Sequence, residues 1–386
     1  MFTHLLLALV MSINPVNSKD AHREKLTDRE KINIDLLYAP FDNLKTDVSD
    51  YRWPINVSNE ITSNFGDYRA THLHCGIDIS TNGEKGHPVF ASRDGEIFRI
   101  RVSHRGYGKM LYIRHADGFV TTYAHLQKFD DEIDRYVKKV QKQTRRYTFD
   151  LRSDISLFTV SKGEVIAYSG DTGIGGVHLH FEVLDSLMNP INPLLFPQLA
   201  EALADTVPPI FSNIALTPLR KNTTIQGKQA QRLLAVKRLT SGEYTIPGLL
   251  AMNGSIGIAA RVTDHSNILK HQIGPYRFEV YLDDELTFTS EKKQISDEAV
   301  HQVDMAFDKK LSRLKKNGRY DKLYIENGNK LPFYDRLPEG SGIINTSEYP
   351  DGLHEIKIVA ADVSGNSSTL RMPVRFTQPA SQKKGK

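Results

Sequence analysis

Cysteine is nearly absent from this chain. Cys75 is the single cysteine among 386 residues, so no intramolecular disulfide can form. No cysteine follows the short apolar run near the N-terminus, which argues against a lipid-anchored precursor. The fold must therefore rest on a hydrophobic core, and a chain of this length with 39% hydrophobic residues can build one. The length favours two domains over one.

Charge of one sign is also lacking. Lysine and arginine together number 50 and aspartate and glutamate 46, which leaves a net charge of +4. This balance gives no reason to expect nucleic acid as a partner, and we expect none. A mildly basic protein would still not be repelled by an anionic cell wall.

Long hydrophobic runs are missing as well. The apolar run at residues 5–13 is too short to span a bilayer, which disfavours an uncleaved membrane anchor. Followed by Val16-Asn17-Ser18, it predicts a signal peptide over residues 1–18, although no Lys or Arg precedes it. We therefore expect an exported protein, in the periplasm or in the extracellular space and cell wall. The mature protein should have no membrane span.

Four histidines and one aspartate are concentrated in three short segments. The segments are His74-Cys75-Gly76-Ile77-Asp78, Tyr123-Ala124-His125-Leu126 and His178-Leu179-His180-Phe181-Glu182. In an extended chain alternate side chains share a face, so His178, His180 and Glu182 should point the same way. Imidazole nitrogens and a carboxylate oxygen are the ligands of catalytic zinc, which keeps a further position for water. Together the segments predict a zinc hydrolase site.

The zinc-binding motif H-E-x-x-H, which carries its own glutamate base, does not occur in the sequence. A proton acceptor must then come from elsewhere, and His125 and His178 are the candidates. One of them would accept the proton of water and the other would donate to the oxyanion; the sequence leaves that assignment open. We expect Glu182 to support the site rather than to react. Cys75 should be a small buried residue that faces away from His74.

These motifs resemble those of the lysostaphin/LytM-type zinc endopeptidases, in which H-x-x-x-D is followed by Y-A-H-L and H-L-H-F-E. The resemblance covers residues 53–197. It implies that His74, Asp78 and His180 bind one Zn²⁺ per chain, and that His125 and His178 act on the metal-activated water and the substrate. Two positions depart from the family's usual residues, Asp171 in place of Asn and Val177 in place of Pro. Neither position supplies a ligand.

The resemblance implies an exported metallo-endopeptidase that hydrolyses peptide bonds of peptidoglycan, in cross-links or stem peptides. Two alternatives stay open. One is a catalytically silent wall-binding or regulatory module on the same scaffold, which the complete set of five site residues disfavours. The other is an endopeptidase that acts on protein, since a shared fold does not fix the substrate. The sequence does not indicate which bond is cut.

We expect a mainly β fold with two domains. The predicted order is a lead-in at 19–52, an antiparallel peptidase domain at 53–200, a β-sandwich of immunoglobulin-like type at 207–378, and a disordered tail at 379–386. The prolines at 208–209 mark the boundary, and residues 53–197 are predicted to fold alone and keep zinc. The sandwich could bind wall glycan, hold a protein partner or block the groove. The charged stretch 309–330 should be a loop or insertion.

An insertion at about 128–161 separates the second and third motifs. Apolar residues at helical spacing predict an amphipathic helix over 131–145. It could wall the substrate groove or cover the edge of the sheet.

Tyr68 and Arg69 are weaker candidates for substrate contact. Four other histidines are expected to be ordinary surface or core residues: His72, His87, His104 and His115. For His104 and His115 a peripheral contact with the substrate is the lesser alternative.

Overall fold

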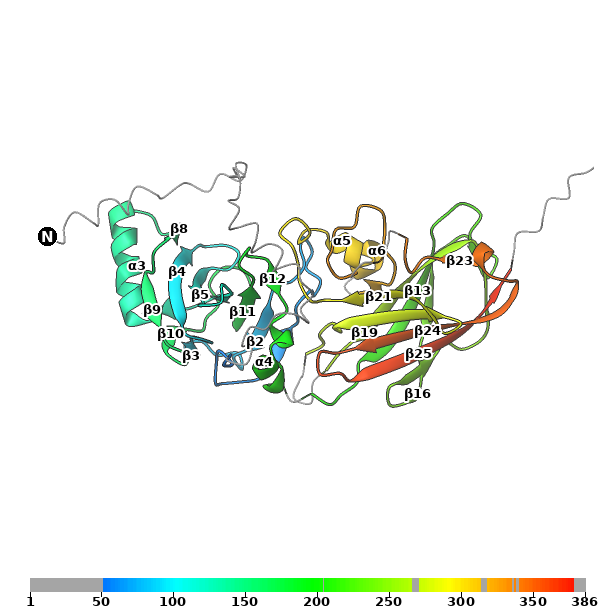
Figure 1. Ribbon diagram of the computed structural model, residues 1–386, viewed down its shortest axis with the longest axis horizontal. Coiled ribbons are helices and arrows are strands. Elements are labelled where there is room, and N and C mark those ends of the chain that lie inside the picture. Colours follow the sequence, from blue (N-terminus) through cyan, green and yellow to red (C-terminus); the bar gives the residue numbers. More distant parts are fainter. Residues whose placement is uncertain are drawn as a thin grey trace, which may run out of the picture.

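The computed structural model describes residues 51–377, apart from residues 204, 266–270, 314–317, 335–336 and 338–339. Two β-rich parts follow each other along the long axis of the molecule (Figure 1). The predicted mainly β fold is confirmed. No helix in the described ranges is long and apolar enough to cross a membrane. The predicted signal peptide, the tail and nearly all of the lead-in lie outside the described residues.

The N-terminal part is built on a nine-stranded sheet of order β1-β2-β11-β6-β5-β4-β8, in which β12 also pairs with β11 and β9 with β4. A three-stranded sheet of order β3-β10-β7 packs against it, and both sheets contribute to one core. The larger sheet contains β1 (Ile61–Ser63), β2 (Ile77–Ser80), β4 (Gly95–Val102), β5 (Lys109–Arg114), β6 (Val120–Ala124), β8 (Phe149–Arg152), β9 (Phe158–Val160), β11 (His178–Leu184) and β12 (Pro190–Ile191). The smaller sheet contains β3 (Pro88–Phe90), β7 (Lys128–Phe129) and β10 (Val165–Tyr168), and η3 (Pro193–Leu195) and α4 (Pro197–Glu201) close this part.

The helix of the insertion forms as predicted. α3 (Asp131–Thr144) begins after Asp130, whose side chain accepts a hydrogen bond from the amide of Glu132, and ends at Arg145 in the left-handed conformation. Ile133 and Val137 bury its apolar face in the core. After the helix, β8 and β9 pair with β4. The insertion therefore extends the sheet at its outer edge, on the left in Figure 1.

The C-terminal part consists of two sheets around one core. Its immunoglobulin-like character stays a prediction. The five-stranded sheet contains β13 (Ile210–Pro218), β15 (Arg232–Ala235), β19 (Ser255–Thr263), β22 (Asp321–Lys322) and β23 (Ile344–Asn345). The eight-stranded sheet contains β14 (Thr224–Ile225), β16 (Lys237–Thr240), β17 (Glu243–Thr245), β18 (Leu250–Asn253), β20 (Arg277–Leu282), β21 (Glu285–Glu291), β24 (Gly352–Ala361) and β25 (Ser367–Phe376).

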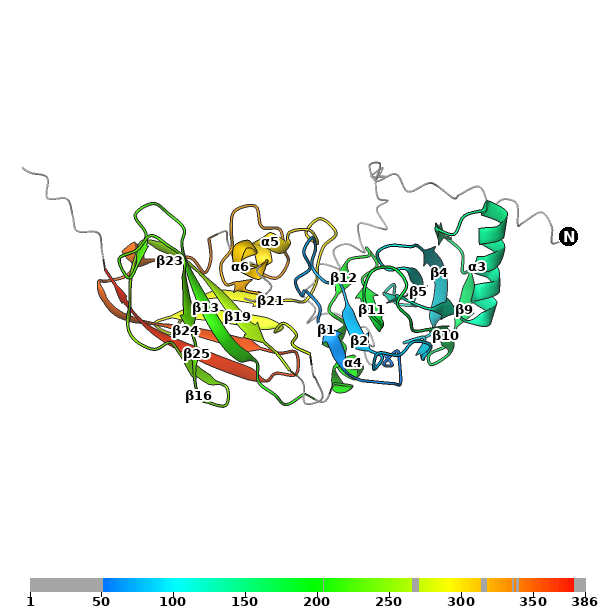
Figure 2. The ribbon, with the colours of Figure 1, turned by 180° about the vertical axis from the view of Figure 1, so that it is seen from behind.

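A long crossover joins β21 to β24. It carries α5 (Val303–Ala306), α6 (Lys309–Ser312) and η4 (Thr346–Glu348) in addition to β22 and β23. The charged stretch at 309–330 belongs to this insertion, but it is not a solvated loop throughout. Tyr320 and Leu323 are buried, because this segment covers the five-stranded sheet. Figure 2 shows the crossover beside the N-terminal part, near β12.

The two parts share their cores. Phe65 and Leu73 come from the N-terminal part but pack in the core of the C-terminal part. Ile273 comes from the C-terminal part and packs in the core of the N-terminal part. Backbone bonds cross the junction, with the Leu73 amide 2.9 Å from the carbonyl of Val300 and the Asn192 amide 2.8 Å from that of Lys293. The boundary near residue 207 therefore separates two sheet systems but not two isolated surfaces.

We expect a fragment that ends at residue 203 to lose stability, contrary to the independent folding predicted from sequence. Phe65 and Leu73 are 1% and 0% exposed, and uncovering each costs about 1.5–3 kcal/mol. That loss is a large share of the roughly 5–15 kcal/mol that holds a domain folded. Urea denaturation of the fragment and the full chain measures it. A fragment carrying Phe65→Ser and Leu73→Gln serves as a control for exposed apolar surface. A plain fragment that unfolds at the same urea concentration as the full chain would support independent domains.

Candidate metal centre

Two neighbouring strands bring the first and third histidine motifs together. β2 pairs with β11 in antiparallel register, and Asp78 lies directly opposite His180. Gly76 precedes β2 where a Cβ atom would lie 2.3 Å from the carbonyl oxygen of Phe181. A side chain at this position would push the segment carrying His74 away from β11, so glycine is required for the close approach.

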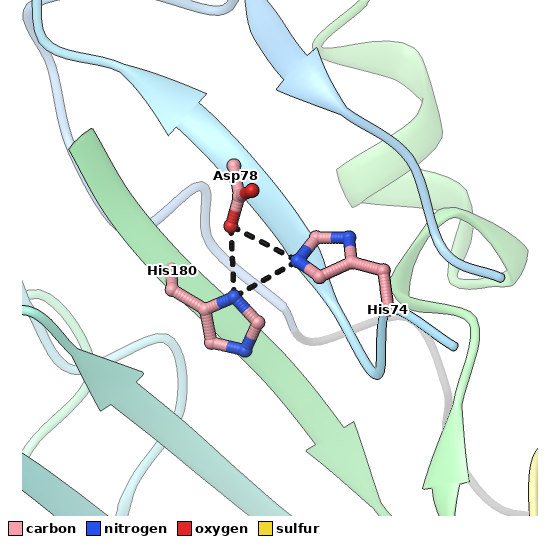
Figure 3. Close-up of side chains that lie close together, drawn as sticks. All are labelled: His74, Asp78 and His180. Carbon is pink, nitrogen blue, oxygen red and sulfur yellow. Dashed lines mark hydrogen bonds and ion pairs between the residues drawn. The ribbon is translucent and has the colours of Figure 1, made fainter. Parts of the chain in front are cut away.

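Figure 3 shows His74, Asp78 and His180 pointing toward one another. Asp78 Oδ1 lies 3.0 Å from His74 Nε2 and 2.8 Å from His180 Nδ1, and the two nitrogens are 3.1 Å apart. Tetrahedral zinc with bonds of about 2.0–2.1 Å holds its ligand atoms about 3.3 Å apart. The three predicted ligands are thus spaced as the ligands of one metal ion, and they form a group that could hold one.

The hydrogen bonds on the far side of each imidazole fix its proton. His74 Nδ1 lies 2.8 Å from the carbonyl oxygen of Asn64, and His180 Nε2 lies 2.9 Å from Glu182 Oε1. Because both partners are acceptors, each of these nitrogens carries the proton. The other nitrogen of each ring then turns a lone pair toward Asp78. Two lone pairs and a carboxylate in contact repel one another unless a cation lies among them, so the donor set fits a metal.

The electrostatics of the group agree with that fit. Burial raises the pKa of Asp78, but the neighbouring histidines outweigh it and hold that pKa well below its usual range. Burial lowers the pKa of His74, despite the opposing effect of Asp78. Burial also lowers the pKa of His180, but hydrogen bonds to Asp78 and Glu182 prevail and raise it to about 9. The pocket therefore favours a positive charge beside Asp78, which a proton or a metal ion can supply.

His125 and His178 lie beside the group without joining it. His125 Nδ1 donates to the carbonyl of Thr172 at 2.9 Å, and His178 Nδ1 donates to that of Gly176 at 2.8 Å. Each ring therefore keeps Nε2 as its acceptor. The ring centroids are 4.6 Å apart, and His178 Nε2 lies 3.4 Å from Asp78 Oδ1. Burial lowers the pKa of His125 to about 4, so that ring is neutral near pH 7.

The backbone of His125 is unusual. Its φ of 58° lies in the left-handed region, which residues other than glycine seldom adopt and which is enriched at functional sites. The His125 amide donates to the carbonyl of Tyr107 at 2.9 Å. This bond and the side-chain bond to Thr172 hold the strained residue at the end of β6.

A cleft of about 1060 Å³ lies over the five motif residues. His72 also lines it, and its interpretation as an ordinary surface or core histidine stays a prediction. No residue of 128–161 lines the cleft, which favours the sheet-edge role for that insertion. The insertion contacts the cleft lining indirectly. β8 pairs with β4 beside Arg99 and Arg101, and Asp150 on β8 binds the Arg99 side chain through contacts of 2.7 and 2.5 Å.

Comparison with known proteins assigns a family to this part of the chain. Residues 72–143 match the model of Peptidase family M23. The chain carries a peptidase M23 domain. The matched stretch contains His74, Asp78 and His125 and ends before the third motif.

Two curated relatives are similar to part of the chain. The murein hydrolase activator NlpD of Salmonella dublin is 29% identical over 136 residues, which are 35% of this chain and 28% of the relative. The DD-carboxypeptidase/endopeptidase Mpg of Neisseria meningitidis is 35% identical over 156 residues, 38% of this chain and 30% of the relative. The chain thus spans less than a third of the length of these relatives.

Solved structures match part of the chain. A zinc-containing peptidase from Vibrio cholerae is 28% identical, with a TM-score of 0.28, and the match covers 37% of this chain and 39% of that one. The catalytic domain of lysostaphin from Staphylococcus simulans is 23% identical, with a TM-score of 0.26, and the match covers 36% of this chain and 89% of that one.

Glu182 supports the M23 centre from behind His180. Its Oε1 accepts from His180 Nε2 at 2.9 Å and from the Tyr107 hydroxyl at 2.8 Å, and its Oε2 accepts from the Thr122 hydroxyl at 3.1 Å. These bonds hold the His180 ring with Nδ1 toward Asp78. The expected supporting role of Glu182 agrees with this geometry. The part played by Tyr107, whose ring centroid lies 5.0 Å from that of His180, was not anticipated from sequence.

We expect Glu182→Gln to weaken zinc binding by about 10- to 100-fold, because loss of a hydrogen-bonded carboxylate behind a ligating histidine has that effect. Competition with a chromophoric chelator measures the affinity. Glu243→Gln, on the exposed face of the distant β17, is the matched control. Equal zinc affinity in Glu182→Gln and the control would show that His180 needs no support from Glu182.

Arg69 fixes the second oxygen of Asp78. Its Nη2 lies 2.9 Å from Asp78 Oδ2 and 2.9 Å from Ser63 Oγ, which leaves Oδ1 for the centre. Arg69 also lines the cleft, as the substrate-contact prediction requires. Tyr68 does not line it: its ring packs edge-on against Phe307, with centroids 5.5 Å apart, at the junction of the two parts.

Of the remaining flagged residues Cys75 lines the cleft, whereas His87, His104 and His115 do not. Cys75 is buried, its thiol lies 3.5 Å from the carbonyl oxygen of Leu73, and burial raises its pKa, so it stays protonated. His115 is buried, with Nδ1 bonded to Asp94 and Nε2 to Thr121. Neither His104, which stacks on Tyr147, nor His87 lines the cleft.

Apart from the metal centre, three aspartates also lie close together. Carboxylate oxygens of Asp205, Asp264 and Asp362 lie within 4.8 Å of one another. Burial, with repulsion from the other two carboxylates, raises the pKa of Asp264 to about 8. Asp264 is therefore protonated in the folded chain near pH 7 but ionised in the unfolded chain.

We expect Asp264→Asn to stabilise the chain at alkaline pH. Since the folded-state pKa is raised, the contribution of Asp264 to wild-type stability falls as the pH rises from about 4 to about 8. Asparagine loses no proton, so the advantage of the variant should grow over that window, to on the order of 1–3 kcal/mol at pH 8. Urea denaturation at pH 5 and pH 8 measures it. A variant less stable than wild type at pH 8 would instead favour a structural need for the charge.

Proposed function

We propose that the M23 domain is a zinc-dependent endopeptidase that hydrolyses peptide bonds of peptidoglycan. The observation that carries the proposal is the convergence of His74 Nε2, Asp78 Oδ1 and His180 Nδ1 within 3.1 Å. These atoms would hold one Zn²⁺, with His125 and His178 facing the same cleft. A zinc ion bound there would polarise a scissile carbonyl and acidify a water molecule.

The chain's own residues supply the proton transfers. The free Nε2 of one histidine would accept a proton from the attacking water. The other histidine would need a proton on Nε2 as well as on Nδ1 in order to donate a hydrogen bond to the negatively charged carbonyl oxygen. Either His125 or His178 can take either part. Asp78 stays ionised throughout, and Arg69 and Glu182 keep the ligand side chains in place.

The substrate class comes from the relatives. The DD-carboxypeptidase/endopeptidase Mpg is 35% identical over 156 residues, although the match covers 30% of its length. We propose that this chain acts on peptide bonds of the wall. Export to the periplasm or the cell wall follows from that substrate and from the predicted signal peptide. We also retain 53–200 as the peptidase domain and 207–378 as the β-sandwich.

A regulatory role is the second candidate, because NlpD is a murein hydrolase activator and is 29% identical over 136 residues. The presence of all five site residues in one cleft favours catalysis over activation alone. A protease that acts on protein is a weaker third candidate.

Digestion of purified sacculi, with the released fragments identified by mass spectrometry, tests the proposal. We expect the zinc-loaded chain to release fragments cut at a peptide bond, and a chelator to abolish the release. Release only when a separate murein hydrolase is added would favour the activator, and cleavage of casein but not of sacculi would favour a protein substrate.

A further inference from the structure

The cleft over the metal centre is not built by the M23 domain alone. The crossover between β21 and β24 contributes four lining residues, Asp297, Val300, His301 and Arg319. The Val300 carbonyl accepts from the Leu73 amide at 2.9 Å, one residue before His74. His301 Nδ1 donates to the carbonyl of Thr71 at 3.1 Å. These bonds fix the crossover as a wall beside the first motif.

Arg319 on this wall is close to the centre. A chain of short contacts leads to it from Asp78: Arg69 Nη2 lies 2.9 Å from Asp78 Oδ2 and 2.9 Å from Ser63 Oγ, and Ser63 Oγ lies 3.0 Å from Asp67 Oδ2. Arg319 Nη1 is 4.0 Å from the same oxygen of Asp67. An extended peptide advances about 3.3 Å per residue, so a substrate held at the centre reaches Arg319 within a few residues.

The guanidinium of Arg319 is only weakly engaged by the protein. Asp67 Oδ2 already accepts from Ser63 Oγ and from the Asn64 amide at 2.8 Å, and Asp67 Oδ1 accepts from the Gly274 amide at 3.0 Å. The contact with Arg319 is at the outer limit of an ion pair, and 45% of the arginine side chain is exposed. Such a pair contributes little to stability, so the fork of donors is available to a ligand.

The charge balance of the cleft points to an anionic ligand. Asp78 and Glu182 are bonded to the histidines of the centre, and Arg69 and Arg99 are paired with Asp78 and Asp150. Three charged groups then remain in the lining, Arg101, Arg319 and Asp297, with a net positive charge before any metal is added. Arginine binds carboxylates in a bidentate manner, which makes a carboxylate the natural partner.

We infer that Arg319 and the crossover wall form a subsite that binds a free carboxylate of the peptide substrate. This inference rests on the proposed function, because it assigns the class of peptide that the cleft selects. The C-terminal part is then a component of the substrate site and not a separate binding module. It selects peptides that carry free carboxylates over those in which the carboxylates are amidated.

Binding and turnover of two synthetic pentapeptides test the inference. One pentapeptide has the sequence of a wall stem peptide with its carboxylates free, and the other has the same sequence with all carboxylates amidated. Dissociation constants are measured by calorimetry on the full chain with chelator present, so binding is observed without hydrolysis. The value of kcat/KM is then measured with zinc. Arg319→Gln is compared with Arg375→Gln, an exposed arginine on β25, and with Arg319→Lys.

We expect Arg319→Gln to raise the dissociation constant of the acidic peptide about 3- to 10-fold and that of the amidated peptide by less than about 2-fold. Arg319→Lys should recover part of the loss, because it keeps the charge but not the fork. Equal effects on both peptides, or none on either, would overturn the inference. If neither peptide is hydrolysed by wild type, the proposed function fails on these substrates, yet the binding measurement still decides the role of Arg319.

Discussion

Replacing His180 with alanine is expected to abolish zinc binding and activity together. His180 Nδ1 lies 2.8 Å from Asp78 Oδ1 and is one of three atoms that could hold the ion. Loss of one of three protein ligands should weaken zinc affinity by well over ~100-fold, since removal of a mere supporting partner already costs 10- to 100-fold. Asp78→Ala should behave in the same way. Atomic absorption on the purified variants, beside hydrolysis of sacculi, measures both effects.

His104→Ala is the matched control for this pair of variants. His104 stacks on Tyr147 with ring centroids 4.0 Å apart and does not line the cleft. It should retain zinc and wild-type turnover. Stoichiometric zinc in His180→Ala would mean that the three-residue group is not the metal site.

Replacing His178 with alanine should separate metal binding from catalysis. Its Nδ1 is fixed by the carbonyl of Gly176 and its Nε2 lies 3.4 Å from Asp78 Oδ1, outside the three-atom group. We therefore expect near-stoichiometric zinc with a loss of at least ~10²-fold in turnover. His125→Ala should show the same pattern. Zinc analysis and initial rates on the two variants provide the measurement.

The opposite distribution of zinc would be decisive against these roles. If His178→Ala lost zinc while His180→Ala kept it, the two histidines of β11 would have exchanged functions. Full turnover in both His125→Ala and His178→Ala would show that neither histidine is needed for proton transfer. Thermal unfolding of each variant distinguishes a lost ligand from a misfolded chain.

The centre was predictable from sequence because strand geometry is local. Alternation along β11 places His178, His180 and Glu182 on one face. His74 and Asp78 lie close together in the sequence, so pairing of β2 with β11 is enough to bring them to His180. The sequence could not supply the register that sets Asp78 opposite His180. Register depends on contacts between strands that are distant in the chain, here held by the close approach at Gly76.

The features of the cleft that the sequence did not predict depend on contacts between distant segments. Arg319 lines the cleft because the crossover from β21 to β24 packs against the first motif, more than two hundred residues earlier. Nothing in the periodicity of either segment encodes that approach. The helix at 131–144 illustrates the reverse, since its apolar spacing and its aspartate cap are local features and its position was predicted well.

X-ray absorption at the zinc edge of the purified full chain reports on the ligands of the proposed zinc ion. We predict one zinc per chain with two imidazole nitrogens, one carboxylate and the remaining ligands from water, and no sulfur. In the His180→Ala variant the edge signal should vanish, and in His178→Ala it should persist. A zinc-free wild-type chain after reconstitution, or a zinc ion bound by the Cys75 sulfur, would contradict the account.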